Sequence, residues 1–409
     1  MYEGKIIKFY REKAKLTQQQ LGEGICSDTH VSKIERGMTD YSRQITSLFS
    51  KRLGINIEEE VKRYKNIKKL LNRWHDAIIK ELFNEAKTIK DELEKEPLLQ
   101  ITDYQILYEL LKARYHLLHN NLEQTDIIIK VIQIKHKDLP PYESNLLKHL
   151  LGIYYLSKQD MIKAVDILKT INAEDYKNPE YYLNLATAYL AVNSKVMAYY
   201  FAEKSLQYFI KTNNILKMID AEMIMLMTRE SDGLSDFQKI VEQYKALTHT
   251  CELCHAPDKK ARLLHNLAFE HYTRHEYVDS SRLYQQSMVL KEKKSAVYLI
   301  SLEGFIRSCF EGNLLSDDKL KKLCHDGLST SREINQYLYL ISFKLLLYLI
   351  NNQQSEYFCY LSSEALPYFK KCGYVTLVQR YEKELFNYYL KTDEKGKALE
   401  LADILINAG

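Results

Sequence analysis

The sequence predicts an all-α fold, and three observations support this prediction. Only 13 of the 409 residues are Gly and 6 are Pro, too few for a protein built of many short strands and turns. Apolar residues recur at steps of three and four over long segments, which is the period of a helix that buries one side. Residues 150–171 and 184–205 also share a pattern at an offset of 34, a length typical of repeated helical hairpins.

Charge is distributed unevenly along the chain. Residues 1–69 contain 15 Lys and Arg against 9 Asp and Glu, an excess of six, whereas the whole chain has a formal net charge of +4. The remaining 340 residues therefore sum to −2. A basic end on a nearly neutral body indicates a polyanionic partner at that end.

The N-terminal end is predicted to form four short helices. The first has an apolar side and ends near Ala14–Lys15. Thr17 and Gln20 have the spacing of a capping box that begins the second helix, and Gly24 can adopt the positive φ that ends it. Ser42 can cap the fourth helix, with Ile45, Leu48, Phe49 and Leu53 packed inward.

The third helix, at about residues 28–36, suggests a function. Ser27 caps it, and Val31 and Ile34 share one face that can anchor it to a core. Its other side chains present an almost wholly polar face. A helix that reads base edges in the major groove of DNA needs this arrangement. We therefore predict a helix-turn-helix unit; a four-helix scaffold without a nucleic-acid role is the alternative.

The motif L-T-Q-x-x-L, followed by S-x-x-x-V-S-K-I-E-R-G, resembles the helix-turn-helix of the Xre, Cro and lambda-repressor superfamily. The linker is one residue shorter than in most of that superfamily and is similar to that of the PlcR and NprR branch, the peptide-pheromone receptors of Gram-positive bacteria. The resemblance implies that three of these side chains face base edges: Thr29, Lys33 and Asp28. Three more would approach phosphate: Gln18, His30 and Arg36. The implied DNA interface comprises Thr17, Gln18, Asp28, Thr29, His30, Ser32, Lys33 and Arg36.

The long remainder contains the repeats. Small residues recur at the offset of 34, where Gly152 corresponds to Ala186 and Ala164 to Ala198. Small residues allow the two helices of a hairpin to cross closely. The pattern resembles the tetratricopeptide repeat, strongly in these two copies and weakly in others further along. Eight or nine hairpins are expected to stack into a right-handed superhelix with a concave face.

The resemblance to PlcR and NprR implies both parts of this architecture. We expect a lambda-repressor-like helix-turn-helix domain followed by a right-handed tetratricopeptide-like superhelix. The expected domains are residues 1–57 for DNA binding, residues 58–97 as a linker helix and first solenoid helix, and residues 98–409 for peptide sensing and dimerisation.

The first helix of each hairpin lines the concave face of such a superhelix. When the small residue is position 8 of the repeat, the inward position 6 is Asn184 in one repeat and Asn266 in another. An Asn offers both a donor and an acceptor to a peptide backbone, although an exposed Asn often has no ligand. An inward Arg can take a peptide carboxylate, and aromatic rings can pack its apolar residues. The expected peptide site, which depends on the family resemblance, comprises Asn184, Arg262, His265, Asn266, Phe269, Tyr272, Arg380 and Asn387.

Other chemistry finds little support. Residues 251–255 read CELCH, the spacing of a haem attachment site, and Cys324 with His325 could complete a zinc set. We interpret these cysteines as ordinary thiols in a helical hairpin. The sequence contains no phosphate-binding loop and no metalloprotease or nucleophile-elbow motif. We therefore expect no cofactor, no metal and no enzymatic activity.

No run approaches the roughly 18 apolar residues of a membrane helix, and the N-terminus has no signal-peptide core, so we expect a cytoplasmic protein without a membrane partner. The main hypothesis is a quorum-sensing transcriptional regulator: a homodimer on a palindromic operator, switched by a short signalling peptide. One alternative is a Rap-like regulator that acts on a response regulator or another protein through its repeats. Another is a regulator that uses the repeats only to dimerise.

Overall fold

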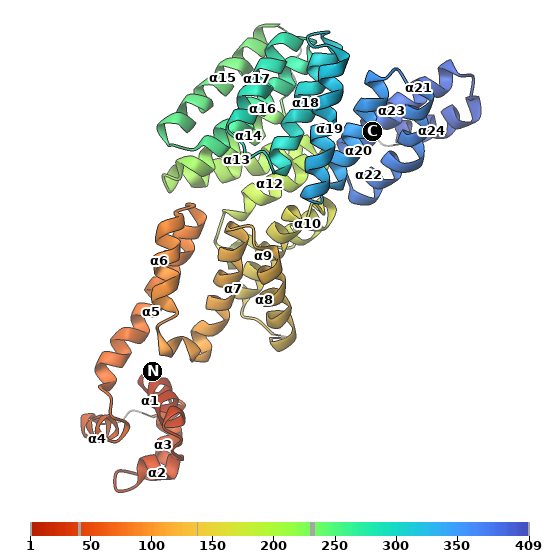
Figure 1. The fold of residues 1–409 in the computed structure, drawn as a ribbon. Coiled ribbons are helices and arrows are strands. Elements are labelled where there is room, and N and C mark those ends of the chain that lie inside the picture. The colour runs from red at the N-terminus through yellow and green to blue at the C-terminus, as the bar shows by residue number, and fades with distance from the viewer. Residues whose placement is uncertain (1, 40–41, 137, 230–233, 408–409) are drawn as a thin grey trace. The chain divides into compact units, whose positions relative to one another are not determined.

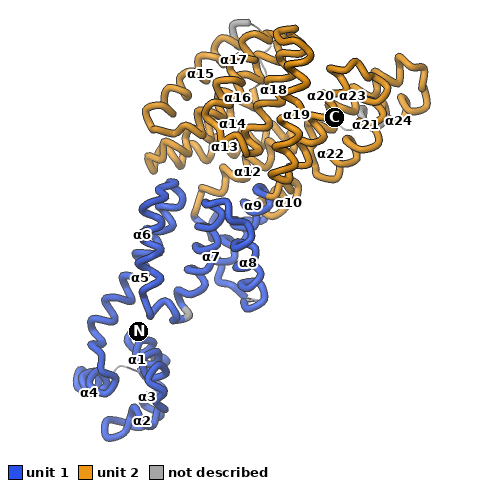
Figure 2. The backbone as a smooth tube through the Cα atoms, in the orientation of Figure 1, with its two compact units in different colours: residues 1–157, 170–177 blue, residues 158–169, 178–409 orange. Residues whose placement is uncertain are grey.

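The computed structural model describes residues 2–39, 42–136, 138–229 and 234–407. Within these ranges every regular element is a helix (Figure 1). Contacts divide the chain into two compact units, residues 1–157 with 170–177 and residues 158–169 with 178–409 (Figure 2). None of the described helices is long and apolar enough to cross a membrane.

The head of the first unit consists of α1 (Tyr2–Lys13), α2 (Gln18–Gly22), α3 (Asp28–Glu35) and α4 (Arg43–Leu53). Local chemistry sets the helix ends as predicted. Thr17 and Gln20 make both hydrogen bonds of the capping box. The Ser27 side chain accepts the His30 N–H, and Gly24 has a φ of 68°. The predicted ends of the helices in the helix-turn-helix are therefore confirmed.

The core of the head forms beneath α3. Val31, Ile34 and Phe49 are fully buried. Gly22 allows α2 and α3 to approach, because a Cβ added there would lie 3.1 Å from Val31. The prediction that Leu48 packs inward is wrong, since its side chain is 43% exposed. Consecutive residues of a helix point about 100° apart, and the ring of Phe49 takes the core position of α4.

The first unit continues with α5 (Ile57–Ile79), α6 (Phe83–Leu93), η1 (Pro97–Gln100), α7 (Thr102–Leu118), α8 (Leu122–Lys135), α9 (Pro141–Ser157) and α11 (Ala173–Tyr176). The helix α5 packs against α1, α6 and α7. Lys5 of α1 pairs with Asp103 of α7, and the Tyr64 hydroxyl of α5 donates to the same carboxylate at 3.0 Å. The Tyr10 hydroxyl donates to Glu60 at 2.7 Å. These bonds attach the head to the helices that follow it.

The second unit is built of α10 (Met161–Leu168), α12 (Tyr181–Ala191), α13 (Lys195–Lys211), α14 (Ile215–Met227), α15 (Leu234–Leu253), α16 (Pro257–Thr273), α17 (Tyr277–Val289), α18 (Ala296–Glu311), α19 (Asp317–Glu333), α20 (Tyr337–Ile350), α21 (Gln354–Tyr360), η2 (Leu361–Ala365), α22 (Leu366–Cys372), α23 (Val375–Lys391) and α24 (Lys395–Asn407). From α12 to α20 each helix packs against the next, and α12, α14, α16, α18 and α20 also contact one another in series. We call these five the A helices. The repeat positions are buried as predicted, with Ala186, Ala198, Ala202 and Ala268 fully inaccessible.

The two ends of the second unit also contact each other. The Tyr374 hydroxyl, just before α23, donates to the Gln159 side chain before α10. The Asn193 side chain, between α12 and α13, donates to Gln379 Oε1 of α23 at 3.0 Å. A Cβ added at Gly373 would lie 3.4 Å from Ile162. Residues more than 180 positions apart in the chain are therefore neighbours within this unit.

Candidate DNA and peptide interfaces

The helix α3 presents the polar face that the sequence predicts. Asp28, Thr29, Lys33 and Arg36 are exposed, whereas His30 and Ser32 are half-buried. Two local bonds shape this face: the Thr29 N–H donates to Asp28 Oδ1 at 2.6 Å, and Arg36 Nε donates to the Ser32 carbonyl at 3.2 Å. The Lys33 ammonium has no bond or ion pair among the described residues. It is therefore available to a base or a phosphate.

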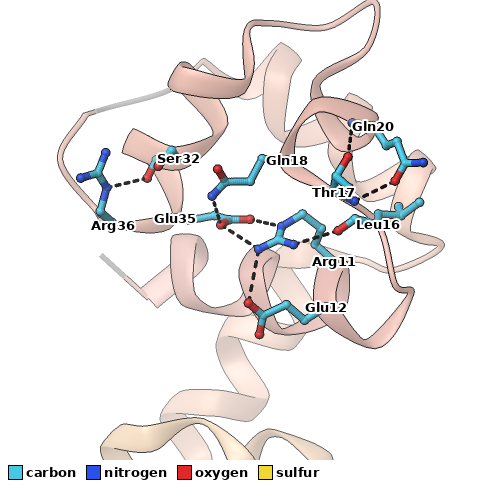
Figure 3. A network of polar contacts seen from close by, with 9 residues as sticks. All are labelled: Arg11, Glu12, Leu16, Thr17, Gln18, Gln20, Ser32, Glu35 and Arg36. Carbon is cyan, nitrogen blue, oxygen red and sulfur yellow. Dashed lines mark hydrogen bonds and ion pairs between the residues drawn. The ribbon is translucent and has the colours of Figure 1, made fainter.

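A buried ion pair supports α3 from behind (Figure 3). Arg11 of α1 donates from Nε to Glu35 Oε1 at 2.5 Å and from Nη2 to Oε2 at 3.1 Å. Its Nη1 donates to the Leu16 carbonyl at 2.8 Å. The bond to Glu35 raises the pKa of Arg11, so the guanidinium stays charged. A bidentate pair of this kind fixes the angle between two helices.

Two residues of the expected DNA interface also have structural roles. The Gln18 amide donates to Glu35 Oε2 at 2.8 Å, and Thr17 caps α2 (Figure 3). Sequence reasoning missed the partner of Gln18, which lies 17 residues away. It also missed Arg52, whose Nη1 donates to the carbonyls of Leu21 and Glu23 at 2.9 and 2.5 Å. Arg52 thus satisfies backbone acceptors at the end of α2.

Five of the eight expected peptide-binding residues lie on one helix, α16: Arg262, His265, Asn266, Phe269 and Tyr272. The Asn266 amide donates to the Met227 sulfur at 3.2 Å. The Phe269 side chain is 48% exposed, and its ring centroid lies 6.3 Å from that of Tyr272. The Tyr272 hydroxyl donates to Glu311 at 2.5 Å. The helix therefore offers amide and aromatic groups along one accessible side.

The other three expected residues lie on different helices. Arg380 of α23 is exposed, and its guanidinium carbon lies 5.6 Å from the Tyr381 ring centroid. Burial raises the pKa of Tyr272, and the charges of Arg307 and Arg380 oppose this increase. Arg380 is therefore within electrostatic range of α16. Asn184 is half-buried on α12, and Asn387 is exposed on α23.

Arg262 has a partner that the sequence did not reveal. Its Nη2 donates to Asp220 Oδ1 of α14 at 2.8 Å, and Lys259 Nζ donates to Asp220 Oδ2 at 2.6 Å. His265 packs its ring against Tyr284, with centroids 5.2 Å apart. Burial, assisted by the positive charge of Lys291, lowers the pKa of His265 to about 3. The imidazole is therefore neutral at physiological pH.

The cysteines considered for metal binding are buried within two helices of the second unit. Cys251 is buried in α15, and Cys324 is buried in α19. Burial raises the pKa of Cys251 to about 11 and that of Cys324 to about 12. Across the described residues, no three His, Cys, Asp or Glu side chains come together as a metal site.

Comparisons with known proteins agree with both parts of this description. A model of the helix-turn-helix family matches residues 7–59. The transcriptional activator NprA of Geobacillus stearothermophilus is 22% identical over 398 residues, 91% of this chain and 94% of that protein.

Solved structures share the fold. NprR in complex with its cognate peptide NprX matches with a TM-score of 0.70 and 16% identity, over 84% of this chain and 99% of that one. A Rap protein complexed with competence and sporulation factor matches with a TM-score of 0.69 and 15% identity, over 84% of this chain and 97% of that one. The head thus matches the helix-turn-helix family, the body shares the fold of NprR and Rap proteins, and the chain is similar to the activator NprA over nearly its full length.

Proposed function

We propose that the protein is a transcriptional regulator that binds operator DNA through α3 and is switched by a short peptide held along the A helices. The observation that carries this proposal is the outward polar face of α3, anchored by Val31, Ile34 and the Arg11–Glu35 pair. The similarity to a transcriptional activator and to a receptor solved with its peptide supports it.

DNA binding is tested by replacing the exposed residues of α3. The full-length protein first selects duplexes from a random-sequence pool, and affinity for a selected duplex is then measured at several salt concentrations. We expect Lys33→Ala to weaken binding by about 1–3 kcal/mol if Lys33 reads a base. If it holds a phosphate, all duplexes weaken alike and the salt slope falls by about one.

The matched control is Lys239→Ala. It removes the same charge from an exposed position on α15, where Lys239 pairs with Asp236 at 3.3 Å. This variant should bind like the wild type. Unchanged affinity in the combined Thr29→Ala and Lys33→Ala variant would remove α3 from the interface.

Peptide binding is tested through the two inward asparagines. Mass spectrometry of small molecules that copurify with the protein identifies the peptide, and calorimetry measures its affinity. We expect each of Asn184→Ala and Asn266→Ala to cost about 1–3 kcal/mol, because peptide amides are left unpaired in the bound state. The control Asn84→Ala alters an exposed Asn of α6 and should leave affinity unchanged. Full affinity in the double variant would place the ligand elsewhere.

We also propose a homodimer on a palindromic operator. One recognition helix contacts only a few base pairs, and paired heads can reach half-sites about one helical turn, roughly 34 Å, apart. The larger second unit is the candidate dimer surface. Light scattering of the complex with a selected duplex should return two protein chains, and a single chain per duplex would contradict this proposal.

A further inference from the structure

Positive charge collects at one end of α16 without an equal number of carboxylates. Lys259 and Arg262 share the single carboxylate of Asp220, at 2.6 and 2.8 Å. Lys291, two residues after the end of α17, donates to the Ser301 hydroxyl of α18 at 2.6 Å. Lys291 brings a third positive charge to this group, and no carboxylate of the described residues pairs with it. We call these five residues the cationic cluster.

The Lys291 ammonium has more hydrogen-bond donors than acceptors around it. An ammonium carries three N–H groups, and Ser301 accepts one of them. Nothing else in the described ranges bonds to the Lys291 ammonium, and no carboxylate pairs with it. Burial, together with the nearby charge of Arg262, lowers the pKa of Lys291 to about 8, so the side chain is still mostly protonated at pH 7. Holding a partly buried ammonium without an anion is unfavourable, and an anionic ligand would relieve this cost.

The neighbours of Lys291 make the cluster a receptive site. His265 Nδ1 lies 2.9 Å from Ser301 Oγ, so Ser301 connects the imidazole and the ammonium. The neutral imidazole adds a polar wall without adding charge. The Arg262 side chain is 44% exposed, which gives the cluster an opening to solvent. The Arg262 guanidinium has five N–H donors, of which Asp220 accepts from one nitrogen.

We propose that Lys291 and Arg262 bind a carboxylate of the signalling peptide, either its C-terminus or an Asp or Glu side chain. This rests on the proposed function, in which a peptide lies along α16 beside His265 and Asn266. Hydrogen bonds between charged partners are roughly twice as strong as neutral ones, and a guanidinium next to an ammonium suits a two-oxygen anion. The cluster then selects peptides that carry a suitably placed carboxylate, while the asparagines bond to the peptide backbone whatever its side chains are.

Three pools of synthetic heptapeptides test the proposal with the full-length protein. The first pool has free C-termini and contains no Asp or Glu. The second has amidated C-termini and includes Asp and Glu. The third is amidated and contains neither residue, so it has no carboxylate. Peptides retained by the protein are counted by mass spectrometry.

We expect the protein to retain the first or the second pool about tenfold better than the third, which corresponds to about 1.4 kcal/mol. Retention of the first identifies the terminal carboxylate, and retention of the second identifies an acidic side chain. Lys291→Gln and, separately, Arg262→Gln should remove this preference. Two variants are used so that a folding defect in one, detected by its melting temperature, leaves the other informative.

Lys294→Gln is the matched control, because Lys294 lies three residues further along the same turn and pairs with Glu333 at 2.8 Å on the surface. It should keep the preference of the wild type. Equal retention of all three pools would overturn the carboxylate site and leave peptide binding intact. Retention of no pool would overturn the peptide-sensing function and, with it, this site.

Discussion

The two charged clusters of the molecule differ in balance. In the head, Glu35 accepts from two Arg11 nitrogens and from the Gln18 amide, so the buried carboxylate has a buried cation as its partner, and Arg11 also contacts the exposed Glu12. In the second unit, Lys259 and Arg262 of the cationic cluster share the Asp220 carboxylate, whereas the Lys291 ammonium bonds only to the Ser301 hydroxyl among the described residues. A buried bidentate pair fixes the angle between two helices, whereas we propose that the cluster around Lys291 is completed by a ligand. The same residue types would then serve structure in one unit and recognition in the other.

The largest expected effect comes from breaking the balanced pair. Glu35→Gln leaves Arg11 buried without its counter-charge, and we expect the head to lose about 3 kcal/mol of stability. Hydrogen exchange of α1 and α3 measures this loss. The control is Glu12→Gln, because Glu12 is an exposed partner of Arg11 at 3.4 Å and should contribute less than about 0.5 kcal/mol. Similar losses in the two variants would show that burial of the pair is unimportant.

A smaller effect should come from His265, the buried neighbour of the cationic cluster, when the pH is lowered. Folding lowers the pKa of His265 from its ordinary value of 6.5 to about 3. Between these two pH values the unfolded chain therefore binds more protons at this residue than the folded chain does. Stability from this group is complete above pH 6.5 and falls as the pH drops below it. We expect a loss of about 1–2 kcal/mol between pH 7 and pH 5, measured by urea unfolding. His265→Gln should have a shallower pH slope, and an unchanged slope would contradict the burial of a neutral imidazole.

The smallest expected change is a gain in stability, in contrast to the losses predicted above. Lys291→Gln removes a partly buried charge that has no carboxylate, so we expect the second unit to gain up to about 1 kcal/mol at pH 7. The gain should shrink from pH 8 to pH 10, because the folded wild type loses the proton of Lys291 over that range. Urea unfolding at three pH values measures it. A loss of stability at pH 7 would show that Lys291 supports the fold. It would then contradict the contrast between the Arg11–Glu35 pair and the cationic cluster.

Much of the fold could be predicted because it depends on residues close in sequence. The capping box of Thr17 and Gln20 and the cap at Ser27 are local, and so is the spacing of Val31 and Ile34. The repeat frame was also readable, since small residues at helix crossings recur at a fixed period.

The site could be predicted only in part, because repeat motifs describe packing. They indicate which positions of an A helix are expected to face inward, and five of the expected residues lie on α16. They do not indicate partners: Asp220 is 42 residues from Arg262, and Ser301 is 36 residues from His265. Such pairs depend on how successive hairpins stack. Lys291 was missed because it lies outside the A helices.

The contacts that join the ends of the second unit have a consequence for folding. Stacked repeats usually unfold one at a time from an end, since each touches only its neighbours. Here Tyr374 meets Gln159 across 215 residues, and Asn193 meets Gln379 across 186. Contacts this distant in sequence slow folding, because a long loop must close before they form. Once formed, they prevent the terminal hairpins from fraying independently, so the unit should unfold more cooperatively than an open array of the same length.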